Sequence, residues 1–249
     1  MNEVCIENIP KKININFDSK EVQLASKTVD RIEEFWNILS MNSDFNAFRG
    51  DIFAIKEVKK STSELSLDLL LTDYAHYLYS LNNEMDSSEA CVIMFTSVII
   101  STTDNFYVFG EMAEHTSSPN RLQCVGGNID KSDVTRNSID LLGNIKREIK
   151  EEVGLDISIE TEIIPKYLKT GGENNFIAVI FEVNTILSSI DFKKMYNNFV
   201  KEIQLKNEKP EFREIVFLEK NRKEINDFFK NDSRNKVDYL EPLLKFDVN

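Results

Sequence analysis

The chain has few of the residues that build disulfide frameworks or zinc sites. Its three cysteines, Cys5, Cys91 and Cys124, are odd in number, widely spaced and without a CxxC pair. Its two histidines, His76 and His115, are too few and too far apart for a zinc cluster or a serine-histidine relay. This composition excludes a disulfide scaffold and a zinc ribbon, and it favours a cytoplasmic location.

Long apolar runs and an excess of basic residues are also absent. No uninterrupted apolar stretch approaches the roughly 18 residues of a spanning helix, and the first residues, MNEVCIENIPKK, lack a basic start followed by an apolar core. The 42 acidic and 30 basic residues give a net charge of -12, which opposes attraction to nucleic acid or an anionic membrane. We therefore expect no nucleic-acid or membrane partner, and a phosphate-bearing substrate would need cations to bridge it to the protein.

The chain does contain enough apolar sequence for a sizeable core, since 41% of its 249 residues are hydrophobic. Residues 1–86 are predicted to form an α/β extension. It comprises a long amphipathic helix over residues 20–41, a hairpin of the strands DIFAIKEV and ELSLDLLL, and a helix over LTDYAHYLYSL. The polar segment NNEMDSSE, residues 82–89, is the predicted boundary, so that residues 87–249 form a second domain.

The second part combines strands and helices in a way that predicts a mixed α/β (α+β) fold. Strands are expected at ACVIMFTSVII, NFYVFGEMA and RLQCV, the last of which runs into Gly126 and Gly127. A helix over roughly residues 137–153 follows and ends at Gly154. Strands at DISIETEII and FIAVIFEV, a helix over residues 191–205, a strand at REIVFL and helices at KEINDFF and DYLEPLLKF complete the prediction.

The segment KREIKEEVGLDI concentrates acidic residues on one face of the predicted helix. Glu148, Glu151 and Glu152 stand at positions i, i+3 and i+4, near a helix end that favours cations. Arg147 can pair with Glu151, and a divalent cation would relieve the remaining repulsion; hard oxygen ligands select Mg²⁺ or Mn²⁺. Because glutamate is a good helix former and charged faces are common, an ordinary solvated face is the alternative.

The residues before this helix make the resemblance to a known family specific. Paired glycines in CVGGNIDKSD allow a backbone carbonyl to approach a metal held by the glutamates. REIKEEVGL, residues 147–155, matches every fixed position in the second half of the Nudix hydrolase signature, Arg-Glu-aliphatic-any-Glu-Glu-any-Gly-aliphatic. The chain resembles Nudix hydrolases over roughly residues 88–249. The resemblance implies a mixed β-sheet sandwiched between helices, with the strand-loop-helix segment as the catalytic box.

The first half of the signature departs from the family pattern. The family has a glycine, five residues and then glutamate, whereas Gly127 is followed at that distance by Asp133. The family then has seven residues before the arginine, whereas this chain has thirteen, VTRNSIDLLGNIK. We expect this six-residue insertion to lengthen the loop and the start of the helix without disturbing the glutamate spacing.

The resemblance implies metal-dependent hydrolysis of a nucleoside diphosphate linked to another moiety, by attack of water on a phosphorus atom. Carried over by position, Glu148, Glu151 and Glu152 are the ligands of Mg²⁺ or Mn²⁺, and Gly127 offers its carbonyl to the same metal. Arg147 is expected to orient a glutamate by ion pairing. One of the carboxylates is the expected general base, and family members differ in which one.

Residues outside the box are also candidates for the site. Glu211, in KPEFREIVFL, precedes a strand as a late glutamate does in Nudix sequences, and Glu173 is a weaker candidate for the same role. Either could equally be a solvated loop acid. His115 and Arg121 are candidates for substrate contact. The alternative for His115 is that it is an ordinary polar loop residue.

The N-terminal part bears on the substrate. FRGDIFAIKEV followed by LSLDLLLTDYAHYLYSLN resembles the extension of Nudix members that act on UDP-sugars, which favours a nucleotide sugar of the UDP-sugar or ADP-ribose type over a nucleoside triphosphate. Asp133 and the insertion motivate an alternative, a non-catalytic Nudix protein that binds a nucleotide metabolite or regulates in response to it. Because many relatives are dimers, a homodimer is also expected.

Overall fold

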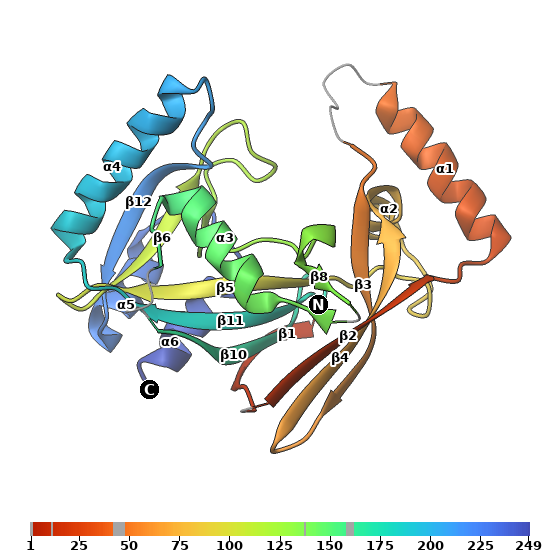
Figure 1. Ribbon diagram of the computed structural model, residues 1–249, viewed down its shortest axis with the longest axis horizontal. Coiled ribbons are helices and arrows are strands. Elements are labelled where there is room, and N and C mark those ends of the chain that lie inside the picture. Colours follow the sequence, from red (N-terminus) through yellow and green to blue (C-terminus); the bar gives the residue numbers. More distant parts are fainter. Residues whose placement is uncertain (1, 11, 42–47, 137, 158–161) are drawn as a thin grey trace.

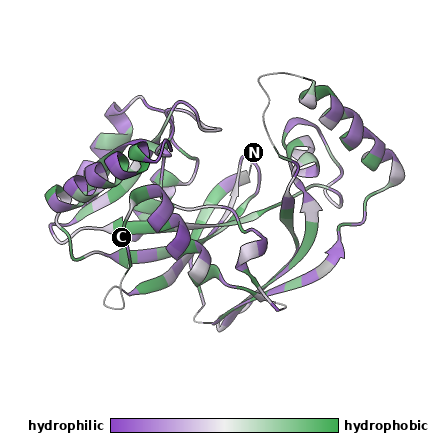
Figure 2. Cartoon of the chain, turned by 45° about the horizontal axis from the view of Figure 1, so that its top comes forward, coloured by the Kyte–Doolittle hydropathy of each residue, from purple (hydrophilic) through white to green (hydrophobic). Residues whose placement is uncertain are grey.

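The computed structural model describes residues 2–10, 12–41, 48–136, 138–157 and 162–249, and these residues form two mixed β-sheets and six α-helices (Figure 1). The predicted α+β class is confirmed. Figure 2 shows hydrophobic residues along the central strands and hydrophilic residues along the outer helices. Within the described ranges, no helix has both the length and the apolar character needed to cross a membrane.

The larger sheet contains seven strands. They are β1 (Asn2–Asn8), β10 (Ile163–Gly172), β11 (Ile177–Asn184), β5 (Met94–Ser101), β6 (Phe106–Met112), β12 (Phe212–Glu219) and the short β7 (Leu122–Gln123). Their order is β1-β10-β11-β5-β6-β12, with β7 paired to β6. β11 and β5 run parallel and the other pairs run antiparallel, so the sheet is mixed.

Helices cover both faces of the larger sheet. They are α3 (Leu141–Val153), α4 (Ser189–Leu205), α5 (Arg222–Asn231) and α6 (Leu240–Asp247). Because successive strand residues point to opposite faces, Val98 and Ile100 of β5 belong to the core under α3 and α4, whereas Ile99 belongs to the core under α5 and α6. The predicted sandwich of a mixed sheet between helices is therefore confirmed.

The smaller sheet contains five strands in the order β3 (Asp51–Lys60), β4 (Glu64–Asp73), β2 (Lys12–Glu21), β9 (Ser138–Ile139) and β8 (Val134–Thr135). Helices α1 (Ser26–Ser40) and α2 (Tyr74–Asn82) accompany it. Leu65, Leu67 and Leu69 alternate along β4 and are fully buried in the same core as Val98 and Ile100 of β5. One hydrophobic core therefore extends from the smaller sheet to the larger one.

Two strand exchanges interlock the first and second parts of the chain. β1, at the start of the chain, pairs with β10 at the edge of the larger sheet. β9, from the second part, pairs with β2 in the smaller sheet through Asn16 and Ser138. The predicted boundary near residue 86 remains a prediction, and neither side of it contains a complete sheet.

The structure corrects the predicted helix over residues 20–41, which begins too early. β2 continues to Glu21, which pairs with Leu71 of β4, and α1 begins only at Ser26. The apolar residues Val22 and Leu24 lie in the connection between the two elements. Their spacing fits the helical period of the residues that follow, but the residues before them belong to a strand because they pair with β4.

Two further boundaries differ from the prediction. The box helix was expected from about residue 137, but it begins at Leu141, because the Asp140 side chain caps it by accepting the Gly143 N–H at 2.9 Å. The strand expected over residues 156–164 includes residues 158–161, which lie outside the described residues. The described strand β10 runs from Ile163 to Gly172.

Candidate metal and active site

The site begins where β7 leads into two glycines. Gly126 has φ +155, and a side chain there would collide with the backbone of Thr96 and Ser97. Only glycine fits that close approach between the chain segments. The next residue, Gly127, accepts a hydrogen bond from the Thr96 N–H at 3.0 Å, and a side chain there would meet the carboxyl of Glu148. A backbone carbonyl and a box carboxylate are thereby brought together.

Helix α3 is held against the larger sheet by one apolar face. Its residues Leu141, Ile145, Ile149 and Val153 repeat at helical spacing and are buried in the core. The helix ends at Gly154, which has φ +71. This docking fixes the polar face beside it, on which the three box glutamates lie.

The three glutamates differ in exposure. The side chain of Glu151 is 64% exposed and that of Glu148 is 15% exposed, whereas Glu152 is buried, with 2% exposure. The Glu152 carboxylate accepts the Gly126 N–H at 3.1 Å. Within the described chain, Glu152 forms no ion pair, which leaves a buried carboxylate without a cation.

The pKa values show that negative charge is crowded at this point. Burial raises the pKa of Glu148 to about 7; Arg147 acts against this shift, while Glu151 and Glu211 add to it. Burial also raises the pKa of Glu152, and the charge of Glu211 is the next largest cause. Glu148, Glu151, Glu152 and Glu211 therefore act electrostatically on one another, as carboxylates do when they share one site.

Arg147 is the main cation near these carboxylates, and Asp133 is its main partner. The guanidinium donates to both carboxylate oxygens of Asp133, with Nη1–Oδ1 2.6 Å and Nη2–Oδ2 3.2 Å. It also donates to Glu148 at 3.1 Å, while Glu151 is 4.0 Å away. The predicted ion pair with Glu151 is present at 4.0 Å, and the buried Asp133, 4% exposed, takes the bidentate contact.

The six-residue insertion forms structure of its own. It was expected to lengthen the loop and the start of the box helix, and the connection before α3 contains the short strands β8 and β9, of which β9 joins the smaller sheet. The loop before it is tied to the same sheet by an ion pair between Lys131 and Asp51. The spacing of the glutamates on α3 is undisturbed.

The structure places Glu211 and His115 beside the box. Glu211 is exposed and precedes β12, and its carbonyl accepts the Ala113 N–H at 2.8 Å, at the start of the loop that carries the exposed His115. Although its side chain is exposed, the surrounding protein desolvates the Glu211 carboxyl and raises its pKa; His115 acts against this and Glu151 adds to it. The weaker candidate Glu173 is exposed in the turn between β10 and β11.

Arg121, the second candidate for substrate contact, lies just before β7. Its guanidinium donates to the Gln123 side chain at 2.6 and 3.2 Å, and it remains partly exposed. Burial raises the pKa of Tyr77 to about 12, and the charge of Arg121 acts against that shift. The Tyr77 ring lies near the Phe176 ring, with centroids 5.9 Å apart and the planes tilted by 32°.

The donor set fits a hard divalent cation, although it is not preassembled around one. Within the described ranges, no three Asp, Glu, His or Cys side chains are arranged to hold a metal ion. Arg147 and the Gly126 N–H hold Glu148 and Glu152 instead. The unpaired buried carboxylate, the mutual repulsion and the nearby Gly127 carbonyl are the features that a divalent cation would satisfy.

Sequence reasoning missed two buried polar residues of the site, Asn144 and Thr96. Both have 0% exposure, and the Thr96 hydroxyl donates to the Asn144 side chain. The available signal was a polar residue at position 144, four residues before Glu148 and therefore on the glutamate face of the helix.

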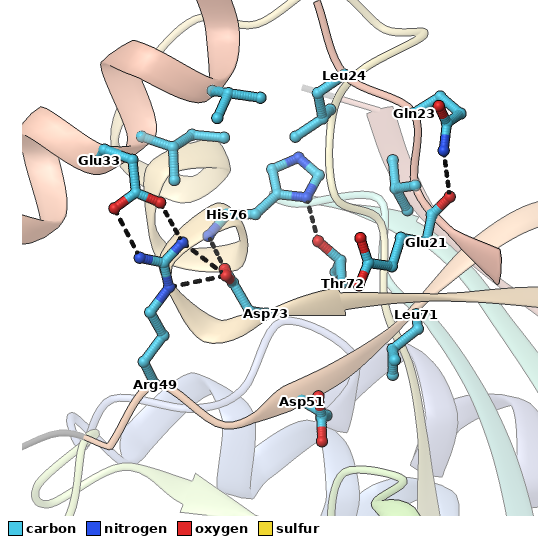
Figure 3. A pocket seen from close by; sticks show the side chains of 13 residues that line it. Glu21, Gln23, Leu24, Glu33, Arg49, Asp51, Leu71, Thr72, Asp73 and His76 are labelled. Atoms are coloured by element: carbon cyan, nitrogen blue, oxygen red, sulfur yellow. Dashed lines mark hydrogen bonds and ion pairs between the residues drawn. The ribbon is translucent and has the colours of Figure 1, made fainter. Parts of the chain in front are cut away.

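A cavity of about 550 Å³ lies elsewhere, between α1 and the ends of β2 and β4 (Figure 3). Several of its polar side chains are already paired: Arg49 binds Glu33 and Asp73 at 2.7 Å, and the His76 ring bonds to Thr72 at 2.7 Å. His76 is buried. The cavity therefore does not coincide with the acidic site on α3.

Comparison with known proteins gives matches among solved structures. No protein-family model and no curated protein matches the chain. A MutT protein from Methanosarcina mazei Go1 aligns with a TM-score of 0.40 and 11% identity, over 62% of this chain and 91% of that chain. A NUDIX-family hydrolase from Clostridium perfringens aligns with a TM-score of 0.35 and 14% identity, over 62% and 95%. The NUDIX domain of Shewanella oneidensis NrtR, solved with ADP ribose, aligns with a TM-score of 0.38 and 9% identity, over 68% and 93%.

Proposed function

We propose that the protein is a Nudix-type enzyme that uses Mg²⁺ or Mn²⁺ to hydrolyse the diphosphate of a nucleoside diphosphate linked to another moiety. The observation that carries the proposal is the mutual electrostatic influence of Glu148, Glu151, Glu152 and Glu211, with the Glu148 carboxyl beside Gly127 and the buried Glu152 in no ion pair among the described residues. An ordinary solvated face would expose Glu148 and Glu152, whereas Glu152 is buried and Glu148 is only 15% exposed.

Glu148, Glu151, Glu152 and the Gly127 carbonyl are the groups that would hold the cation. When bound, the cation neutralises charge on the diphosphate and makes a nearby water more acidic, which an acidic protein needs in order to accept an acidic substrate. Arg147 orients Glu148 through the contact at 3.1 Å.

The reaction needs a base and contacts to the phosphates. A box carboxylate or Glu211 takes a proton from the attacking water. The water oxygen forms a bond to phosphorus while the bridging P–O bond breaks, and the departing phosphate oxygen carries the electron pair away. His115 lies near the start of the loop between β6 and β7, and Arg121 lies at its end. Both are proposed to contact the phosphates.

The proposed substrate is a nucleotide sugar of the UDP-sugar or ADP-ribose type, and the product is a nucleoside monophosphate. The support is the resemblance of the N-terminal segment to that of UDP-sugar-hydrolysing members. The net charge of -12 supports a small-molecule substrate in preference to nucleic acid. A homodimer and a cytoplasmic location complete the proposal.

A non-catalytic protein that binds a nucleotide metabolite is the second candidate. It is favoured by the replacement of glutamate with Asp133 and by the insertion whose strand β9 joins the smaller sheet. Both candidate functions predict nucleotide binding, but only the first predicts that the nucleotide is hydrolysed.

The test is to incubate the full chain with UDP-sugars, ADP-ribose and nucleoside triphosphates at several Mg²⁺ and Mn²⁺ concentrations and to measure released nucleoside monophosphate. We expect metal-dependent release from a nucleotide sugar. Tight nucleotide binding by calorimetry without any product would establish the second candidate, and neither binding nor turnover would refute both.

A further inference from the structure

Asn144 uses all of its side-chain hydrogen-bonding groups inside the box. Its Nδ2 donates to the Asp133 carboxylate at 2.9 Å and to the Asn128 carbonyl at 3.0 Å. Its Oδ1 accepts the hydroxyl of Thr96. Two acceptors face the nitrogen and one donor faces the oxygen, so the orientation of the amide is defined by its partners.

Each of these partners belongs to a different part of the candidate site. Asn128 follows Gly127, the residue that is proposed to offer its carbonyl to the metal. The Thr96 backbone N–H donates to that same Gly127 carbonyl at 3.0 Å. Asp133 holds both Nη atoms of Arg147. One buried amide on α3 therefore connects the glycine loop, strand β5 and the arginine-carboxylate pair.

The short side chain of Asp133 explains why such a connection is needed. An aspartate reaches one methylene less far than the glutamate that the family signature has at this position. The Asp130 N–H binds Asp133 Oδ2 at 3.0 Å from the loop, and Asn144 binds the same oxygen from the helix. The two donors fix the carboxylate where Arg147 can grip both of its oxygens.

We propose that Asn144 is a positioning residue for the metal ligands, which acts on Glu148 through Asp133 and Arg147 and on Gly127 through Asn128 and Thr96. The inference rests on the proposed function. A buried side chain that oriented the metal ligands in this way would set the affinity for the cation. A side chain that only filled space would affect stability alone.

The experiment compares Asn144→Ala with the wild type in the full chain. The Mn²⁺ concentration that gives half of the maximal melting-temperature shift should rise about 10- to 100-fold, the usual effect of losing an outer partner of metal ligands. The Mn²⁺ requirement for hydrolysis should rise in parallel, while the KM for substrate at saturating Mn²⁺ stays within about threefold, because Asn144 is buried and cannot touch substrate.

Tyr107→Phe is the matched control, because it removes a buried hydrogen bond to Asp247 in the other helix layer, away from the box. It should lower the melting temperature and leave the Mn²⁺ requirement unchanged. Where Asn144→Ala does not fold, Thr96→Val is the second variant. It replaces the hydroxyl that donates to the Asn144 oxygen with a methyl group, and it should raise the Mn²⁺ requirement by a smaller factor.

A rescue experiment distinguishes a positioning role of Asn144 from a role in which its side chain only fills space. Asp133→Glu alone should raise the Mn²⁺ requirement, because the added methylene crowds the buried Asn144. In the Asn144→Ala background the same change should recover part of the lost affinity, because the longer carboxylate enters the vacated space and reaches Arg147.

The outcomes distinguish this inference from the proposed function. If Asn144→Ala, or Thr96→Val in its place, keeps the wild-type Mn²⁺ requirement, or if Asp133→Glu has the same effect in both backgrounds, the positioning role is refuted while the proposed function stands. A wild-type chain that shows neither a Mn²⁺-dependent melting shift nor hydrolysis would refute the proposed function and this inference with it.

Discussion

At the scale of single residues, Glu152 decides between a metal site and a charged surface. Its carboxylate is 2% exposed, accepts one backbone N–H and is acted on by the charges of Glu211, Glu148 and Glu151. A buried carboxylate without a cation destabilises a protein unless a ligand supplies the charge. Glu152 therefore gains most from a bound divalent ion.

Replacement of Glu152 by glutamine should abolish activity without harming the fold. The amide oxygen can still accept the Gly126 N–H, but the charge that holds the cation is lost, so the rate should fall by about two orders of magnitude or more. The melting temperature without metal should stay equal or rise, because like-charge repulsion is relieved. Steady-state rates and melting curves with and without Mn²⁺ measure both effects.

The control is Glu202→Gln, at an exposed position of α4. It should leave both the rate and the Mn²⁺-dependent melting shift unchanged. Equal rates and equal shifts for Glu152→Gln and the wild type would show that the box glutamates form an ordinary surface.

The two adjacent glycines should respond differently to alanine. At Gly126 a Cβ meets the rigid backbone of Thr96 and Ser97 at a positive φ, so Gly126→Ala should destabilise the fold by more than about 1 kcal/mol, several degrees in melting temperature. At Gly127 a Cβ meets only the end of the Glu148 side chain, which can move. Gly127→Ala should therefore lower the metal affinity more than the stability. Equal losses of stability would contradict this difference.

At the scale of elements, the sequence predicted what is encoded locally. The box helix has apolar residues at helical spacing and ends at Gly154, so its glutamate face could be predicted from neighbouring residues alone. The strands β8 and β9 could not, because β9 is stabilised by β2, more than a hundred residues earlier. β1 was missed for the same reason, since its partner β10 lies far along the chain.

The candidate site likewise has a part that is encoded locally and a part that depends on the tertiary fold. The charges on α3 were visible as a local pattern, and the roles assigned to them and to Glu211, His115 and Arg121 remain predictions. The grip of Arg147 on Asp133 and the contacts of Asn144 with Asp133 and Asn128 depend on how the loop folds back on the helix. No spacing rule gives such contacts.

The C-terminal helix α6 is anchored by a buried charge, and its removal should be costly. The Asp247 side chain has 0% exposure and binds Lys166 at 2.6 Å, Lys220 at 2.9 Å and the Tyr167 hydroxyl at 2.7 Å. Asp247→Asn weakens these charged contacts, and we expect a loss of about 2–4 kcal/mol in unfolding free energy at pH 7. Urea denaturation measures it.

The pH dependence of that loss has a definite sign. Burial alone would raise the pKa of Asp247, but the hydrogen bonds from Lys166, Tyr107, Lys220 and Tyr167 hold it well below its ordinary value. A carboxyl with a depressed pKa stabilises the fold fully above its unfolded value, about 3.9, and less as pH falls further. The difference between wild type and Asp247→Asn should therefore be constant from pH 7 to 5 and shrink by pH 3. A difference that grew on acidification would contradict the role of this anchor.

At the scale of the whole molecule, the two sheets share one core and exchange strands. Ile15 and Leu67 from the first part belong to the same buried cluster as Val98 and Ile145 from the second. β1 extends the larger sheet, and β9 extends the smaller one. Neither part can bury its apolar face without the other, so the predicted boundary near residue 86 should not behave as a break between independently folding units.

We therefore expect the full chain to unfold in a single transition, with calorimetric and van't Hoff enthalpies that agree. A chain of residues 87–249 should fail to fold at 25 °C, because it lacks β1 and the buried leucines of β4 that complete its core. A chain without residues 1–9 is the milder comparison. It loses one edge strand and the buried Ile6, so it should melt at a lower temperature but still in one step. Two resolved transitions in the full chain, together with a folded 87–249 chain, would show that the core is not shared energetically and that the boundary separates true domains.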